Sequence, residues 1–164
     1  YIFPVRNLQG KITGFAGRLV ESDSFGPKWK NLVKTRFAVF PWSQGAGESI
    51  EQTKTVIILE SLGDYLALAS YDIWNGIVLF GVNLNSKIIS KLIAIGVKKI
   101  YISTNNDSLA DKNTVGNEAA VKLKTKLDNF FLPENVIIRL PLKAKDWGES
   151  PEDDILKFKQ EITS

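Results

Sequence analysis

The first twenty residues contain two apolar, β-branched stretches separated by a glycine-containing turn. Ile2 to Val5 and Ile12 to Val20 have the composition of strands, and residues 8–11 supply a turn with a glycine that can adopt a positive φ. The pattern predicts a β-hairpin. Gly14 and Gly17 lie within the second strand, which indicates a close backbone approach or a bulge there.

The following thirty residues lack a clear hydrophobic period. Residues 22–35 are polar and contain Gly and Pro, so we predict a loop. Residues 43–53 contain Gly45 and Gly47 and no apolar periodicity. We therefore predict a linker there, with a boundary near residue 50 between a subdomain of residues 1–50 and a second one of residues 51–164.

From residue 55 onward, short apolar runs alternate with amphipathic segments. The apolar runs predict four strands: Thr55–Leu59, Ile77–Phe80, Lys99–Ser103 and Val136–Leu140. The amphipathic segments predict four helices. The first is Leu62–Tyr71, and the second is capped by Asn85 or Ser86 and ends at Gly96. The third starts at Asn113 or Thr114 and has apolar residues as far as Phe130 and Phe131, and the fourth is capped by Ser150 with Pro151 at its first position. This order predicts an α/β fold: a mostly parallel, four-stranded sheet with helices on both faces, beside a small β-containing N-terminal lobe.

Charge is divided unevenly between the two predicted parts. Eight Lys or Arg against four Asp or Glu give residues 1–54 a net charge of +4, whereas thirteen against fourteen give residues 55–164 a net charge of −1. A basic lobe beside a balanced body suits a protein that holds polyanions at one end. A solvated basic face without a partner explains the charge alone equally well.

The residue types that are missing narrow the chemistry. The chain has no Cys and no His, which excludes a disulfide framework, a thiol nucleophile and a zinc ribbon, and removes the commonest general base. Catalysis would have to use carboxylates, lysines, hydroxyls or bound hard cations. The chain also has no Met, so we expect a piece cut from a longer polypeptide. Neither a membrane-spanning run nor a secretory leader is visible, and we expect a soluble cytoplasmic protein without membrane contacts.

Polar and acidic residues follow three of the four predicted strands of the parallel sheet. Glu60 ends the first strand and Asp64 comes one helical turn later, Asn105 to Asp107 end the third, and Asp146 follows the fourth. In an open parallel sheet these positions meet at the carboxyl edge, where ligands bind. Oxygen ligands without His or Cys favour Mg²⁺ or Mn²⁺.

Each of these residues also has a purely structural explanation. Glu60 and Asp64 are acids near a helix N-terminus, where the helix dipole favours them. Residues 105–107 have the composition of a turn. Asp146 could pair with Lys143 or Lys145, and Trp147 is more often a core aromatic than a platform for a base.

Two motifs of this region resemble those of a known family. Residues 56–64 (VIILESLGD) resemble the opening of TOPRIM domains, an apolar strand followed by Glu-Gly-x-x-Asp, with Ser61 in place of the usual Gly. Residues 102–107 and 116–120 resemble the second TOPRIM signature, a strand ending in Asp-x-Asp and the small-residue helix start behind it. Asn105 replaces the first Asp of that signature, and Asp111, in a longer following loop, could substitute for it.

Further motifs resemble DnaG-like DNA primases of bacteria and phages. Residues 140–149 are similar to their Leu-Pro to Lys-Asp closing motif, and residues 2–18 are similar to the stretch that ends in Gly-Phe-Gly-Gly-Arg. Residues 28–31 (KWKN) resemble their Lys-Tyr-x-Asn. The resemblance covers roughly residues 1 to 150, and the front-lobe motif favours a primase over other TOPRIM enzymes.

The resemblance implies a Rossmann-like TOPRIM fold and the Mg²⁺- or Mn²⁺-dependent synthesis of short RNA primers from NTPs on a single-stranded DNA template. It implies catalytic roles for Glu60, Asp64 and Asp107 and a metal site formed by Glu60, Asn105, Asp107 and Asp146. Contacts with nucleic acid or NTP are implied for the following residues: Arg18, Lys28, Asn31, Lys34 and Lys145. It also implies a replicative helicase as partner, bound through regions absent from this chain, and the host cytoplasm as the location if a phage encodes it.

Two alternatives remain open at this stage. One is a TOPRIM nuclease or topoisomerase-like enzyme, which uses a similar acidic site. The other is a catalytically degenerate TOPRIM module that binds nucleic acid or a partner, with Asn105 as a sign of lost catalysis.

Overall fold

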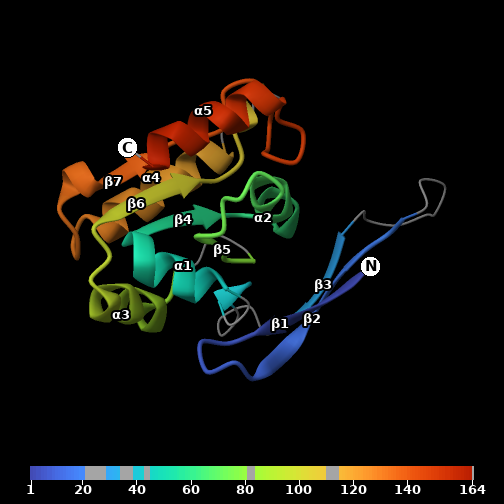
Figure 1. Cartoon of the computed structure of the whole chain (residues 1–164), viewed down its shortest axis with the longest axis horizontal. Helices are drawn as coiled ribbons and strands as arrows, with labels where there is room; N and C mark the ends of the chain where they lie inside the picture. The colour runs from blue at the N-terminus through green and yellow to red at the C-terminus, as the bar shows by residue number, and fades with distance from the viewer. Residues whose placement is uncertain (21–28, 34–38, 43–44, 81–83, 110–114, 164) are drawn as a thin grey trace.

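Two separate sheets form the framework of the protein. The structure is a computed structural model that describes residues 1–20, 29–33, 39–42, 45–80, 84–109 and 115–163. A three-stranded sheet near the N-terminus, here called the front sheet, extends from an α/β body built on a four-stranded sheet (Figure 1).

The front sheet confirms the predicted hairpin. Its strands are β1 (Ile2–Arg6), β2 (Ile12–Arg18) and β3 (Trp29–Val33), in the order β1-β2-β3, and both pairings are antiparallel. Val5 pairs with Gly14 while Arg6 pairs with Ile12, so one residue of β2 is left over between them. The irregularity lies next to Gly14, where the sequence indicated a bulge.

The prediction of a loop over residues 22–35 is wrong for Trp29–Val33, which form β3. Lys30, Asn31 and Leu32 are all exposed, so this strand has no alternation of apolar and polar residues to reveal it. Its conformation follows from pairing with β2, from Gly14 opposite Val33 to Arg18 opposite Trp29. Residues 21–28 and 34–38, which include Lys28 and Lys34, lie outside the described residues.

The predicted linker over residues 43–53 is also wrong, because most of it is helix α1 (Ala46–Thr53). The buried face of α1 consists of Ala46, Gly47 and Ile50, of which only Ile50 gives a hydrophobic signal in the sequence. A Cβ on Gly47 would lie 3.0 Å from the Trp42 carbonyl oxygen, so the close packing requires glycine there. The subdomain boundary predicted near residue 50 falls within this helix and stays a prediction.

The second sheet confirms the parallel arrangement that the sequence predicted. Its strands are β4 (Thr55–Leu59), β5 (Gly76–Val78), β6 (Lys99–Ser103) and β7 (Val136–Ile138). Their order is β5-β4-β6-β7, and every pairing between them is parallel. β4 and β6 have the predicted bounds. β5 ends before Phe80, whose φ of 39° is incompatible with an extended strand.

Four further helices alternate with these strands. They are α2 (Leu62–Ala69), α3 (Ser86–Ile95), α4 (Val115–Leu127) and α5 (Glu152–Thr163), and short 3₁₀ turns occur at Asp107–Leu109 and Pro133–Asn135. As predicted, Asn85 caps α3 by accepting a hydrogen bond from the Ile88 N–H, and Gly96 ends it with a φ of 75°.

The predictions for α4 and α5 need correction at the helix ends. α4 stops at Leu127, because Phe130 and Phe131 both donate backbone hydrogen bonds to the Leu127 carbonyl in a turn that leads back to β7. α5 starts at Glu152, one residue after Pro151, which was predicted as the first helical position. The predicted start of α4 at residue 113 or 114 lies outside the described residues.

Helices cover both faces of the four-stranded sheet (Figure 1). Val56 and Ile58 of β4 pack with residues of α1, α3 and α4 on one face. Ile57 and Leu59 pack with α2 and α5 on the other. Among the described residues, every helix is too short or too polar to span a lipid bilayer.

The front sheet is joined to the second face of the body. Val5 and Ala16 of the front sheet are fully buried in the same cluster as Phe40 and Leu59. Val78 of β5 donates a backbone hydrogen bond of 2.7 Å to Phe40, and the neighbouring Val39 donates one of 3.1 Å to Arg6 of β1, so these two residues link the sheets. The front sheet is thereby fixed beside the carboxyl ends of β4 and β5.

Candidate active site at the carboxyl edge

Glu60 and Asn105 lie side by side at the carboxyl edge of the sheet. They follow β4 and β6, two neighbouring parallel strands whose last residues, Leu59 and Ser103, are paired. The Asn105 N–H points at Glu60, 3.4 Å from its Oε2 atom. The side-chain oxygen of Asn105 is buried and has no hydrogen-bond partner in the described part of the chain. A buried acceptor without a partner is costly, so this oxygen is an open position for a ligand.

A groove of about 300 Å³ runs between this edge and the front sheet. Glu60 and Asn105 line it from the body, and Trp29 and Asn31 of β3 line it from the front sheet. Ser61, Leu62 and Phe80 complete the lining. The groove therefore combines two of the predicted metal ligands with Asn31, a predicted nucleic-acid contact.

Arg18 holds a positive charge beside this groove. Its guanidinium carbon lies 5.2 Å from the centre of the Trp29 ring, a cation–π contact. Phe3 supports the same ring with a centroid distance of 6.2 Å. Gly63 of α2 lies close to the same ring, since a Cβ built on it would be 3.8 Å from Trp29. The front sheet thus places one predicted nucleic-acid residue, Arg18, against a wall of the groove.

Asp64 is buried behind this edge rather than exposed to the groove. Its side chain forms a capping box at the start of α2: the Ser61 hydroxyl donates to Oδ2 at 2.7 Å, and the Ser61 N–H donates to the same oxygen at 3.2 Å. Oδ1 accepts the Trp147 N–H at 2.9 Å. Burial raises the pKa of the Asp64 carboxyl from 3.8 to about 6, against the opposing effect of these hydrogen bonds. The structural explanation that the sequence left open, an acid at a helix start, therefore fits Asp64.

Asp107 is turned toward Lys145. The Lys145 ammonium lies 3.4 Å from Asp107 Oδ1. Asn106, between Asn105 and Asp107, fixes this turn to the following loop, because its N–H donates to the Lys145 carbonyl and its amide donates to the Pro141 carbonyl. Asp107 and Lys145 therefore form an ion pair, although Asp107 was predicted as a metal ligand and Lys145 as a nucleotide contact.

Asp146 and Trp147 follow Lys145 in the same loop. Asp146 accepts a hydrogen bond from the Glu149 N–H at 2.9 Å and is not among the residues lining the groove. Trp147 is a core residue, 1% exposed, whose indole N–H donates to the Ser103 hydroxyl at 2.8 Å. The core explanation for Trp147 is therefore confirmed.

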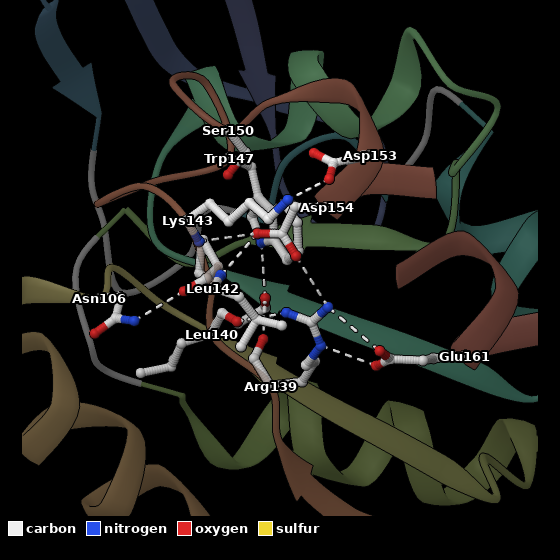
Figure 2. Close-up of polar contacts among 12 residues, drawn as sticks. Asn106, Arg139, Leu140, Leu142, Lys143, Trp147, Ser150, Asp153, Asp154 and Glu161 are labelled. Atoms are coloured by element: carbon white, nitrogen blue, oxygen red, sulfur yellow. Dashed lines mark hydrogen bonds and ion pairs between the residues drawn. The ribbon is translucent and has the colours of Figure 1, made fainter. Parts of the chain in front are cut away.

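Sequence reasoning missed a buried network of charges beneath this loop (Figure 2). Arg139, after β7, forms ion pairs with Asp154 at 3.2 Å and with Glu161 at 2.8 Å, both on α5. Asp154 is 2% exposed and also accepts hydrogen bonds from the N–H groups of Leu142 and Lys143. The available signal was an Arg directly after an apolar strand, since a charge in such a position needs a partner.

The structure brings some of the predicted site residues together and leaves others apart. Glu60, Asn105 and Asn31 share the groove, whereas Asp107 pairs with Lys145 and Asp64 is enclosed. Among the described residues, no three acidic side chains come close enough to hold a metal ion. Lys28, Lys34 and Asp111 lie outside the described residues.

The groove fits one hard cation. Glu60 contributes a carboxylate, and the unpartnered Asn105 oxygen contributes a neutral ligand of the kind that Mg²⁺ and Mn²⁺ accept. Such ions keep several water or substrate oxygens as ligands, so two protein ligands suffice to hold one.

Residues 57–150, more than half of the chain, match the family model described as Toprim-like. The chain therefore belongs to the Toprim-like family. The match begins within β4 and ends in the loop after β7, so it includes the carboxyl edge of the sheet described above.

The sequence similarity to curated relatives extends over the front sheet as well. The chain is 27% identical over 157 residues to the DNA primase of Borreliella burgdorferi, covering 93% of this chain and 27% of that protein. It is 27% identical over 160 residues to the DNA primase of Listeria innocua, covering 94% of this chain and 23% of that one. The chain spans about a quarter of the length of these relatives.

Solved structures show the same fold. The catalytic domain of the DnaG primase bound to single-stranded DNA aligns with a TM-score of 0.74 at 19% identity, over 99% of this chain and 50% of that one. The RNA polymerase domain of Mycobacterium tuberculosis DnaG aligns with a TM-score of 0.72 at 14% identity, over 99% of this chain and 54% of that one. The predicted TOPRIM fold of the DnaG primase type, front lobe included, is confirmed.

Proposed function

We propose that this chain is part of the catalytic core of a DNA primase that makes short RNA primers on a single-stranded DNA template, using Mg²⁺ or Mn²⁺. The observation that carries the proposal is the groove itself. It combines Glu60 and the unpartnered Asn105 oxygen with Trp29 and Asn31 of the front sheet. The reported relatives support the same activity, and they favour a primase over a nuclease or topoisomerase-like enzyme.

In this proposal Glu60 and Asn105 hold the cation at the floor of the groove. A divalent cation bound there would neutralise charge on the phosphates during nucleotidyl transfer. Because such catalysis is mostly positioning and electrostatics, it is compatible with a chain that lacks His and Cys. Asp64 acts by positioning, since it ties the turn after Glu60 to Trp147.

The front sheet would hold the nucleic acid or the incoming NTP. Arg18 is pre-oriented by its contact with Trp29, and Asn31 faces the groove from the next strand. Lys28 and Lys34, at the two ends of β3 in sequence, would add basic contacts with phosphate. Asp146 as a further metal ligand, the helicase partner, the cytoplasmic location and the phage origin stay predictions.

A test of this function is primer synthesis by the full-length protein carrying Glu60→Gln. The substitution keeps the size of the side chain and removes its charge, so we expect primer yield to fall by at least about a hundredfold, a loss typical for an electrostatic catalytic group. Glu51→Gln is the matched control, because Glu51 is an exposed glutamate of α1. Wild-type primer yield from a folded Glu60→Gln protein would contradict the proposal.

One observation favours a second candidate function, a nucleic-acid-binding module without catalysis. Asn105 replaces an acid of the family motif, and the described residues bring no three acidic side chains together. Such a module would bind single-stranded DNA equally well with Mg²⁺ and with a chelator, and its Glu60→Gln variant would bind as the wild type does. The primase proposal expects no primer synthesis in the chelator.

A further inference from the structure

Lys145 brings a positive charge to the acidic edge of the sheet. Its ammonium lies 3.4 Å from Asp107 Oδ1, and the Asp107 side chain is only 18% exposed while that of Lys145 is 44% exposed. The Asp107 side chain is therefore mostly shielded from solvent, whereas that of Lys145 stays partly exposed. Neither residue is among those that line the groove of Glu60 and Asn105.

The loop that carries Lys145 is fixed at three points along its length. Near its start, Asp154 accepts the Leu142 N–H at 2.7 Å (Figure 2). In the middle, the Lys145 carbonyl accepts the Asn106 N–H at 2.7 Å. Near its end, the Trp147 N–H donates to Asp64 at 2.9 Å. None of these bonds involves the ammonium group, so the backbone holds Lys145 at the edge whether or not the ion pair forms.

The charges at this edge suit one divalent cation rather than two. Glu60 is the carboxylate that lines the groove, and Asn105 adds an oxygen without charge. Asp107 is neutralised by Lys145, and Asp146 accepts a bond from its own loop. A second divalent ion would meet one paired carboxylate and a lysine, which disfavours its binding.

We propose that the Lys145 ammonium takes the place of a second divalent cation at this edge. Asp107 serves to orient the Lys145 ammonium, and the chain binds a single Mg²⁺ or Mn²⁺ at Glu60 and Asn105. The proposal rests on the function proposed above and deepens it, because a fixed lysine supplies to the phosphates the positive charge that the missing ion would have supplied. Asn106 and Asp154 are positioning residues for this lysine.

The test is calorimetric titration of the chain with MnCl₂, which needs no catalytic activity. Wild type should bind one ion. Lys145→Gln removes one positive charge from beside Asp107, so a second ion should bind or the affinity should rise by about two- to fivefold, the range that one partly exposed charge pair permits. Lys145→Arg keeps the charge and should bind as the wild type does. Thermal unfolding of each variant checks that it is folded.

Lys143→Gln is the matched control. Lys143 is a second lysine of the same loop, and it pairs with the exposed Asp153 at the start of α5 rather than with Asp107 (Figure 2). Its substitution should leave Mn²⁺ binding unchanged. Two ions bound by the wild type, or unchanged or weaker Mn²⁺ binding by Lys145→Gln, would overturn the proposal.

The outcome of this titration is separable from that of the proposed function. If Lys145→Gln leaves Mn²⁺ binding unchanged while Glu60→Gln abolishes primer synthesis, the result supports the primase function and contradicts the role proposed for Lys145. If Glu60→Gln retains primer synthesis, the proposed primase mechanism is contradicted, whatever the result of the titration of Lys145→Gln.

Discussion

Asp64 is a carboxylate whose properties are set by burial. It is 1% exposed, and burial raises its pKa from 3.8 to about 6, with a smaller contribution from the nearby charge of Asp146. The folded protein therefore retains a proton on Asp64 at pH values where the unfolded chain has already lost it. It follows that the contribution of Asp64 to the free energy of unfolding falls as the pH rises from about 4 to about 6.

Asp64→Asn removes this titration. Without divalent ions, the free energy of unfolding of the wild type minus that of Asp64→Asn should fall by up to about 3 kcal/mol between about pH 4 and about pH 7. Urea denaturation of both proteins at several pH values measures this difference and cancels the other titrating groups. A difference that stays constant, or that rises with pH, would show that Asp64 is not protonated preferentially in the folded state.

At the residue scale, the sequence predicted which side chains reach the carboxyl edge but not which partners they find there. Glu60 and Asn105 follow strands that a β-branched pattern identifies, so their meeting followed from the parallel sheet alone. The burial of Asp64 depends on Trp147, 83 positions further along the chain. The pairing of Asp107 with Lys145 likewise depends on how a distant loop folds back, which no local pattern encodes.

At the element scale, the loop between β7 and α5 is organised by one residue of the helix. Asp154 binds the N–H groups of Leu142 and Lys143 and forms an ion pair with Arg139, which is only 8% exposed. The Arg139 guanidinium also lies 5.5 Å from the centre of the Trp147 ring and 5.3 Å from that of Phe158. These contacts therefore anchor the loop to α5.

Asp154→Asn should destabilise the protein strongly. It leaves the buried Arg139 with Glu161 as its remaining ionic partner, and we expect the free energy of unfolding to fall by about 2–4 kcal/mol, near the cost of breaking a buried pair. Asp153→Asn is the control, because the neighbouring Asp153 is exposed and its pair with Lys143 should contribute far less than the buried pair of Asp154. Guanidinium denaturation compares the two, and equal losses would contradict the role given to Asp154.

Elements with a strong hydrophobic pattern were predictable, and elements made by tertiary contacts were not. β4 and β6 are continuous apolar runs, and α3 carries both a capping Asn85 and a terminal Gly96. β3 has exposed side chains and exists through its pairing with β2. Two of the three residues that α1 buries are Ala46 and Gly47, small residues that sequence periodicity cannot separate from a linker.

At the scale of the whole molecule, the candidate site depends on two parts that meet. The α/β body supplies Glu60 and Asn105, and the front sheet supplies Trp29 and Asn31 across the same groove. Backbone bonding through Val39 and Phe40 and a shared core hold the two parts in this arrangement. The motifs of both parts were visible in the sequence, but the groove between them required the structure.

The most direct test of this account is a crystal structure of the protein soaked with MnCl₂, with the metal located by its anomalous scattering. We expect one manganese ion in the groove, bound by the Glu60 carboxylate and the Asn105 side-chain oxygen, while Asp107 keeps its ion pair with Lys145. A single bound ion together with an intact ion pair between Lys145 and Asp107 would support both proposals. Manganese bound away from Glu60, or no manganese in the groove at all, would contradict the central claim that this edge is a metal-dependent active site.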